Sequence, residues 1–220
     1  MRADIHIHSI HSSDGKVSVG DVVKRCRMLG FGAVSIVDHN SFAGSVEALA
    51  LENEDVIILP GMEITTAAGH VLAYHITEEV ERGLSVEETI DRIHGLAGIA
   101  VAPHPFRIWS GLGRMEAIKG RFDAIEVMNA RSMGGSNKRA QDLARSLDRP
   151  VTGGSDAHSL DQIGKSFTVF PEGCQNPDDL VKAIRNKRTT AEGSSRTAIG
   201  SMGYGLKCIS EWARRGFRRL

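Results

Sequence analysis

Short runs of consecutive apolar residues recur along the 220-residue chain, and stretches with helical spacing separate them. Strands of a parallel sheet that are buried on both faces are continuously apolar rather than alternating. Each run therefore predicts a buried strand, and the alternation with helices favours βα units around a parallel sheet. The seven expected strands are 3–7, 33–37, 56–59, 71–74, 99–102, 124–128 and 150–152.

Helix start signals lie between these runs. Ser18 is followed three residues later by Asp21, and Ser85 by Glu88, which is the spacing of a capping box. Asn176 precedes Pro177, so an N-cap residue stands before a proline in the first helical turn. The expected helices are 18–30, 42–51, 85–97, 137–147, 176–186 and 210–219.

Each apolar run ends in, or is soon followed by, a residue that can bind a metal ion. In a β/α barrel, catalytic side chains lie at the carboxyl ends of the strands. One placement rule therefore brings most of the nine histidines to one mouth and predicts a metal cluster there. The residues are His6 and His8, Asp38 and His39, Glu63, His75, His104, Glu126, and Asp156 and His158.

Two of these strand ends carry paired ligands. His6 and His8 are two residues apart in a strand, so their side chains share one face. Asp156 and His158 repeat this spacing after the last run. Neutral imidazole is a common ligand for zinc, iron and similar ions. Asp14 lies in the loop after the first strand, which could fold back over the site.

Single residues complete the candidate cluster. Glu63 adds a carboxylate, which can bridge two cations, whereas one imidazole nitrogen cannot. Prolines on both sides of His104 predict a restricted, extended backbone there. The strand 71–74 has a histidine at each end, and the direction of the strand favours His75, at its carboxyl end, over His70.

Composition excludes several classes of protein. The chain is 41% hydrophobic and 25% charged, which argues against disorder. Its formal net charge is zero, so no global field favours nucleic acid or membrane. No apolar stretch approaches the roughly 20 residues that a membrane span needs. The three cysteines, Cys26, Cys174 and Cys208, contain no C-x-x-C pair, and free thiols fit a cytoplasmic location.

The charge is unevenly distributed at the end of the chain. Residues 196–220 hold six lysines and arginines against one acid. We expect a barrel domain over residues 1–193 and a basic tail over 194–220 that contains the last helix. The tail could contact an anionic partner, although a solvated basic face is the simpler explanation.

The donor types favour hard or borderline cations in a multinuclear site, because no cysteine is placed to help. Such ions make hydroxide at neutral pH and clamp the attacking and leaving oxygens of a phosphoryl group. The chain has no G-x-S-x-G or P-loop pattern that would supply other chemistry. The pattern therefore predicts a metal-dependent hydrolase.

Over residues 1–170 the motifs resemble, in order, those of the polymerase and histidinol phosphatase (PHP) superfamily. The resemblance implies an α/β fold, a distorted (β/α)7 TIM-like barrel, with three metal ions at its mouth. Zinc, manganese and iron all suit such ligands, so two to three divalent ions are expected. The matching pieces are Asp4-Ile-His6-Ile-His8-Ser9, Ser13-Asp14-Gly15, Asp38-His39-Asn40, Gly61-Met-Glu63, His104-Pro105 and Gly154-Ser-Asp156-Ala-His158.

The resemblance also implies roles for individual residues. The first metal would be held by His6, His8, Glu63 and Asp156; Glu63 would bridge to a second, held also by His75 and His104; the third would be held by Asp14, His39 and His158. Asp14, Glu63, His104, Asp156 and His158 form the expected catalytic set. Asp38 and Glu126 are expected to orient other groups. The candidates for substrate phosphate contact are Arg107, Arg131 and Asn129.

The function that these residues favour is a metal-dependent phosphoesterase. Metal-activated hydroxide at a trinuclear site would hydrolyse a small phosphate monoester or a nucleotide. The alternatives are a histidinol-phosphatase-like enzyme, a metal-binding module or nuclease that serves a nucleic-acid-processing complex, and a metal-dependent amidohydrolase. The expected partner is a small phosphorylated substrate, with nucleic acid less favoured and no membrane contact; the sequence leaves the oligomeric state open.

Overall fold

The computed structural model describes residues 1–51, 56–108 and 110–195. The expected helix 210–219, Cys208 and nearly all of the basic tail lie outside the described residues. The division into a barrel and a tail therefore stays a prediction.

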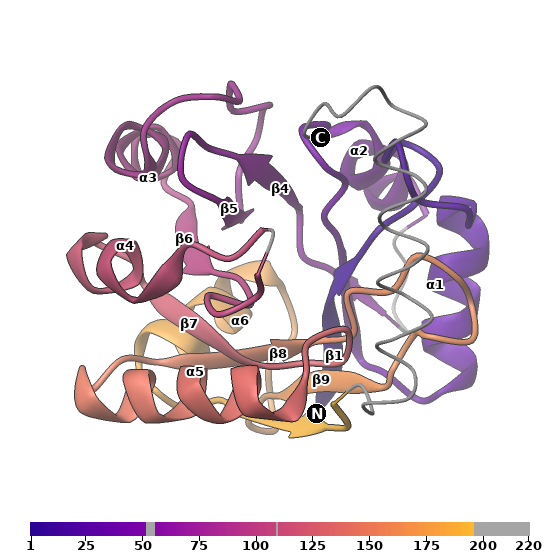
Figure 1. Ribbon diagram of the computed structural model, residues 1–220. Helices are drawn as coiled ribbons and strands as arrows, with labels where there is room; N and C mark the ends of the chain where they lie inside the picture. Colours follow the sequence, from indigo (N-terminus) through magenta and orange to yellow (C-terminus); the bar gives the residue numbers. More distant parts are fainter. Residues whose placement is uncertain (52–55, 109, 196–220) are drawn as a thin grey trace.

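The described strands form two five-stranded mixed sheets (Figure 1). The first sheet has the order β10 (Thr190–Gly193), β9 (Ser166–Val169), β1 (Arg2–Ile7), β2 (Ala33–Ile36) and β3 (Ile57–Ile58). The second has the order β4 (Gly61–Thr65), β5 (His70–Tyr74), β6 (Ile99–Ala102), β7 (Ala124–Asn129) and β8 (Val151–Gly154).

Strand direction differs from the expected all-parallel barrel. Strands β1–β2–β3 and β6–β7–β8 are parallel, but β9 is antiparallel to β1 and β10, and β5 is antiparallel to β4 and β6. Isolated bridges join the two sheets: Ile7 of β1 pairs with Ala157 after β8, and His39 after β2 pairs with Glu63 of β4. The mixed α/β class is confirmed, whereas the described strands do not form one closed barrel.

All seven apolar runs contain a strand, and three further strands lie outside them. Strand β4 begins at Gly61, only two residues after β3, so it lies just beyond the apolar run 56–59. One face of β9 is buried but consists of Ser166 and Thr168, and β10 has no buried residue, so neither strand has the continuous apolar pattern of a central strand.

The helices are α1 (Val19–Met28), α2 (Ala43–Leu49), α3 (Val86–Gly95), α4 (Gly113–Lys119), α5 (Gly134–Ser146) and α6 (Pro177–Arg185). The caps predicted at Ser18, Ser85 and Asn176 are confirmed, because each side chain accepts a backbone N–H three residues later. Helix α4 was not expected, and it begins at Leu112 without a side-chain cap. Among the described residues, no helix is long and apolar enough to cross a membrane.

The helices cover the outer faces of the sheets. Helices α1 and α2 lie against the first sheet, and α3, α4 and α5 lie against the second (Figure 1). Strand β7 shows how one strand serves two faces: Ile125 and Val127 pack under the helices, whereas Ala124 and Glu126 point between the sheets.

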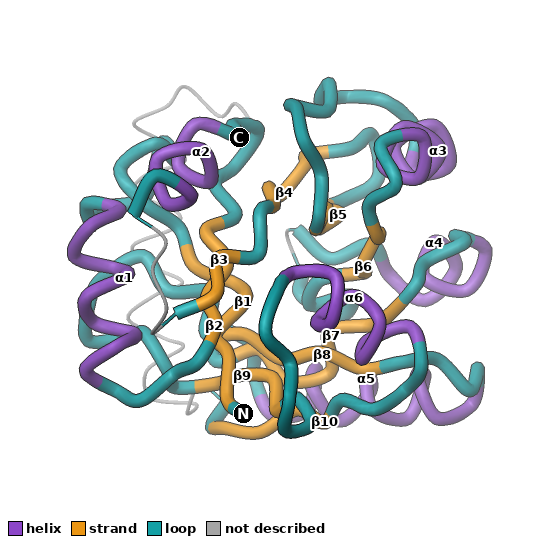
Figure 2. The backbone as a smooth tube through the Cα atoms, turned by 180° about the vertical axis from the view of Figure 1, so that it is seen from behind, coloured by secondary structure: helices purple, strands orange, loops and turns teal. Residues whose placement is uncertain are grey.

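The space between the sheets has an apolar end and a polar end. At the apolar end, Leu180 and Ile184 of α6 belong to one buried cluster with Ile5 and Leu72. Figure 2 shows the position of α6 beside the strands. The buried Tyr74 hydroxyl donates to the Ile5 carbonyl at 2.8 Å and so ties the sheets together. At the opposite end, the carboxyl ends of β1, β7 and β8 converge with β4 and the start of β5, and the buried side chains are imidazoles and carboxylates.

Candidate metal centre

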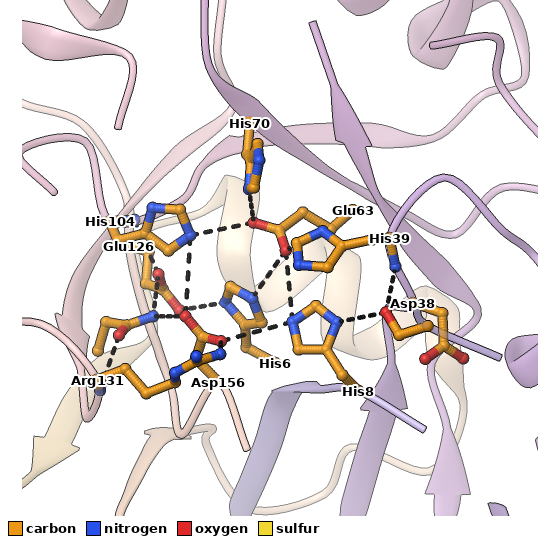
Figure 3. A network of polar contacts seen from close by, with 12 residues as sticks. His6, His8, Asp38, His39, Glu63, His70, His104, Glu126, Arg131 and Asp156 are labelled. Atoms are coloured by element: carbon orange, nitrogen blue, oxygen red, sulfur yellow. Dashed lines mark hydrogen bonds and ion pairs between the residues drawn. The ribbon is translucent and has the colours of Figure 1, made fainter. Parts of the chain in front are cut away.

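The carboxylate of Glu63 lies at the middle of five imidazole rings (Figure 3). Its Oε1 lies 2.9 Å from His70 Nδ1 and 3.0 Å from His104 Nε2. Its Oε2 lies 3.1 Å from His39 Nδ1, 3.4 Å from His8 Nε2 and 3.6 Å from His6 Nε2. Since each oxygen faces its own group of imidazoles, this carboxylate can bridge two cations.

Several buried nitrogens in this cluster have no hydrogen-bond partner. They include His6 Nε2 and His8 Nε2, which both face the Glu63 carboxylate. A buried polar atom without a partner costs about 1–3 kcal/mol, so native proteins seldom retain one without a use. Metal coordination would satisfy both atoms, and the residues present therefore fit a metal cluster.

Other contacts hold the histidines in place. His6 Nδ1 lies 2.8 Å from Glu126 Oε1, which leaves His6 Nε2 facing the centre. Glu126 Oε2 also accepts the backbone N–H of His104 at 2.9 Å. A metal-binding histidine commonly uses its second nitrogen in this way. Glu126 thus orients His6 and His104. Asp38 accepts both the N–H (2.6 Å) and the hydroxyl (2.7 Å) of Ser9 and fixes the first loop.

The donor atoms fall into overlapping groups. Four sets of three donors lie within 4.8 Å of one another. Because the sets share members, the cluster can hold more than one ion, and its nitrogen and oxygen donors suit hard or borderline cations. The sets are His8, His39 and His158; His6, His104 and Asp156; His6, His8 and Glu63; and His39, Glu63 and His70.

Three of the rings have protonation states that suit metal binding, whereas nearby carboxylates raise the pKa of His6 well above its usual value despite its burial. Burial lowers the pKa of His8 to about 4, that of His39 to about 3 and that of His104 to about 4, so these rings are neutral at pH 7. Burial works against ionised carboxylates, yet the pKa of Glu63 lies well below its usual range because imidazoles surround it. Arg107 and Arg131 have the same effect on the pKa of Asp156.

The loop that carries Asp14 does fold back over the cluster. Asp14 Oδ2 lies 2.9 Å from His158 Nε2, and Asp14 Oδ1 lies 4.0 Å from His39 Nε2. The loop is tight at Gly15, where a Cβ would lie 1.8 Å from the Ser9 carbonyl oxygen. The structure therefore brings Asp14, His39 and His158 together.

The strand-direction argument for His75 is wrong. Strand β5 runs antiparallel to β4 and β6, so its amino end, with His70, lies at the polar end of the molecule. His70, Leu72 and Tyr74 alternate inward along β5, and His70 contacts Glu63. His75 instead lies 3.3 Å from the exposed Asp178.

A signal in the sequence could have found this reversal. Only four residues separate β4 from β5. A parallel connection needs a dozen or more residues, so this link requires a hairpin. The second strand of a hairpin begins where the first one ends, which places His70 beside Glu63.

The backbone at His104 also differs from its prediction. The φ angles are +28° at His104 and +54° at Asp156, in the left-handed region rather than the extended one. Such conformations cost on the order of 1–3 kcal/mol for a non-glycine residue. They persist because buried hydrogen bonds hold them: His104 N–H donates to Glu126, and Asp156 N–H donates to the His6 carbonyl at 2.7 Å.

Two arginines lie beside Asp156. Arg107 Nη2 donates to Asp156 Oδ2 at 2.5 Å, and Arg131 Nη1 donates to Asp156 Oδ1 at 3.1 Å. Arg131 Nη1 also lies 2.7 Å from His158 Nε2. Their side chains retain 20% and 13% exposure, so both guanidinium groups lie at the boundary between the cluster and solvent.

Asn129 is not placed to touch a substrate, because it is fully buried and its amide is occupied. Its oxygen accepts from Arg107 Nη2 at 2.7 Å and from the backbone of Arg131 at 3.0 Å. Its nitrogen donates to Glu126 at 3.0 Å and to Asp156 at 3.1 Å. Asn129 is therefore a positioning residue for these side chains.

The chain is similar in sequence and in fold to known proteins. The uncharacterized protein MJ1587 of Methanocaldococcus jannaschii is 38% identical over 143 residues, which are 59% of this chain and 82% of that protein. A two-domain protein from Bacteroides vulgatus that contains a predicted PHP-like metal-dependent phosphoesterase has a similar fold, with a TM-score of 0.74 at 18% identity over 88% of this chain and 65% of that one.

A lesion-specific endonuclease from Pyrococcus furiosus is also similar in fold, with a TM-score of 0.66 at 19% identity over 84% of this chain and 56% of that one. A PHP-associated family model matches residues 134–189. The PHP domain model matches residues 4–143, which is more than half of the sequence. The chain belongs to the PHP family.

Proposed function

We propose that this protein is a phosphoesterase that hydrolyses a small phosphate monoester or a nucleotide with two to three divalent metal ions. The observation that carries the proposal is the Glu63 carboxylate among five imidazoles, with two arginines beside the same cluster. The likeness in fold to a protein that contains a predicted metal-dependent phosphoesterase supports it.

The geometry suggests three groups of ligands. His6, His8, Glu63 and Asp156 would hold one ion, and Glu63, His70 and His104 a second. Asp14, His39 and His158 would hold a third. In this assignment His70 replaces His75, and zinc, manganese and iron all fit the donors.

The protein's own residues prepare the site for a phosphate. When bound, the ions lower the pKa of a water molecule and neutralise charge on the phosphoryl oxygens. Arg107 and Arg131 present N–H donors at the open side of the cluster, where they can bind phosphate oxygens. The Asn129 side-chain oxygen accepts a hydrogen bond from Arg107 and so fixes the position of its guanidinium group. The low pKa values of His8, His39 and His104 keep these rings neutral and able to bind metal.

A second candidate is cleavage of a phosphodiester in nucleic acid. The likeness to the Pyrococcus furiosus endonuclease favours it, although this chain spans 56% of that protein. The same charged cluster could stabilise either kind of ester. Monoester and diester substrates therefore have to be compared directly.

The test measures metal content by mass spectrometry and turnover of p-nitrophenyl phosphate, bis(p-nitrophenyl) phosphate and an abasic-site duplex. We expect two to three ions per chain and fastest turnover of the monoester. His8→Ala should lose metal and at least about 100-fold in kcat/KM while remaining folded. His94→Ala is the control, because His94 meets Asp123 away from the cluster.

Preferred turnover of the duplex would replace the monoesterase proposal with the nuclease. Full activity in His8→Ala with reduced metal content would contradict a multinuclear mechanism. A protein that binds no metal after reconstitution would overturn both.

A further inference from the structure

Several exposed apolar side chains lie in the loops beside the metal centre. Among the described residues, five exposed ones lie in the loops that follow metal-site strands or in the adjoining helix α4. We call them the rim residues: Ile108 (83% exposed), Met115 (59%), Ile10 (55%), Met133 (50%) and Leu160 (42%).

Four of the rim residues come one or two residues after a histidine or arginine of the metal centre. Ile10 comes two residues after His8, and Leu160 comes two residues after His158. Ile108 is next to Arg107, and Met133 comes two residues after Arg131. These apolar side chains are therefore carried by the same loops as the two arginines and the strand-end histidines.

Hydrogen bonds hold the loops of the rim residues next to one another. The Ser136 hydroxyl donates to the Phe106 carbonyl at 3.2 Å, which holds the loops of Met133 and Ile108 together. The backbone N–H of His8 donates to the Ala157 carbonyl at 2.8 Å, which holds the loops of Ile10 and Leu160 together. The contact of Arg131 with His158 joins the two pairs.

Met115 lies in the first turn of α4. The backbone N–H of Gly113 donates to the Pro105 carbonyl at 2.8 Å, which ties the start of α4 to the loop of Ile108. Methionine is flexible and its sulfur makes favourable contacts with aromatic rings. Met115 and Met133 therefore give the rim an adaptable surface that suits flat apolar groups.

The metal centre and the rim residues have opposite chemistry. The metal cluster and the arginines can bind a phosphate group and nothing apolar. Single exposed apolar residues are ordinary, but several of them on the loops beside one charged centre favour a binding surface. A small polar leaving group would leave the rim in water, whereas an aromatic one would bury it favourably.

Resting on the proposed function, we propose that the rim residues select phosphate esters whose leaving group carries an aromatic ring system. In the reaction, a water oxygen bonds to phosphorus, the bond from phosphorus to the ester oxygen breaks, and that oxygen leaves as an alcohol after taking up a proton. The products are inorganic phosphate and the aromatic alcohol.

The test compares two primary alkyl esters, 2-(1-naphthyl)ethyl phosphate and ethyl phosphate, with the metal-loaded full chain. Their alcohols have similar acidity, so a difference in kcat/KM reports recognition of the ring. We expect at least about a tenfold preference for the naphthyl ester. In the double variant Ile108→Ser/Met133→Ser, this ratio should fall at least about fivefold.

Met28→Ser is the matched control. Met28 is 70% exposed but ends α1, next to Leu29, whose carbonyl accepts from Arg2 at the amino end of β1, opposite the metal centre; both rates should therefore stay as in the wild type. Metal content is measured in every variant to show that the centre is intact.

Four outcomes would overturn the proposal. The wild type could hydrolyse both esters equally, or the double variant could keep the wild-type ratio; in both cases the phosphoesterase function stands and the rim has no role in selection. Hydrolysis of neither ester overturns both proposals. A double variant that changes only the sedimentation coefficient would identify the rim as a contact between protein molecules.

Discussion

The two histidines at the ends of β5 are five residues apart and meet different environments. His70 lies against the buried Glu63, whereas His75 pairs with Asp178 at the surface. Exposed ion pairs contribute about 0–1 kcal/mol, so the His75 contact has little effect on folding. The pair of histidines therefore offers a comparison within one strand.

We expect His70→Ala to lose at least about tenfold in kcat/KM and part of the bound metal, because a ligand is removed. His75→Ala should keep wild-type values of both. The measurement is metal content together with p-nitrophenyl phosphate kinetics. Loss of metal in His75→Ala but not in His70→Ala would contradict the assignment.

Arg107 provides a second test at this scale. Arg107→Ala should lower kcat/KM by about 100-fold with the metals still bound, because a charged donor to the phosphate is lost. Arg107→Lys keeps the charge but loses the planar fork of donors, so only partial activity is expected. Unchanged kinetics in Arg107→Ala would remove this residue from the site.

The sequence predicts which residues gather at the site better than it predicts what each of them does there. The spacing of His6 and His8 reveals a shared face, because strand geometry fixes it. The role of Asn129 depends on Arg107 and Asp156, which are distant in sequence and become its neighbours only in the folded chain. No local pattern could distinguish a substrate contact from a buried amide.

The position of β1 depends on one buried carboxylate, that of Asp4. Asp4 accepts backbone N–H groups from His6 at 3.4 Å, Ser155 at 3.0 Å and Gly164 at 2.8 Å. It therefore joins β1 to the loop after β8 and to the turn before β9. Burial raises the pKa of Asp4 to about 6 despite these bonds.

We expect Asp4→Ala to lower the free energy of unfolding by about 3 kcal/mol, because buried donors lose their acceptor. Denaturant unfolding of the metal-free protein measures this. The exposed Asp161 provides the control, and Asp161→Ala should stay within about 0.5 kcal/mol of wild type. Equal stability of both variants would show that water replaces the Asp4 oxygens.

Strand position was predictable from the sequence, whereas strand direction was not. A continuous apolar run reports burial on two faces, and burial is the same for a strand that runs either way. Direction depends on the connection, as the short link between β4 and β5 shows. Helix α4 was missed because Leu112 provides no capping side chain.

The candidate metal ligands come from both sheets of the molecule. His6 belongs to β1 in the first sheet, and Glu63 and His70 belong to β4 and β5 in the second. Bound ions would therefore link the sheets beside the isolated bridge between His39 and Glu63. Metal binding should stabilise the fold as well as the site.

Chelation tests this link. A ligand at 100 to 1,000 times its Kd stabilises a protein by about 3–4 kcal/mol, and each kcal/mol shifts Tm by about 2–4 °C in a chain of this size. We expect a chelator to lower Tm by roughly 10 °C and added metal to restore it, as measured by calorimetry. His8→Ala should show a smaller shift. The same Tm with and without metal would mean that the ions do not hold the sheets together.

The hairpin of β4 and β5 has a further consequence for how the sequence can change. It supplies both Glu63 and His70 from residues 61–74. Because side chains alternate along a strand, one residue inserted within β4 before Glu63 would turn its carboxylate to the opposite face. Single-residue insertions and deletions in these strands should therefore be purged by selection, whereas changes of length in the four-residue turn can accumulate.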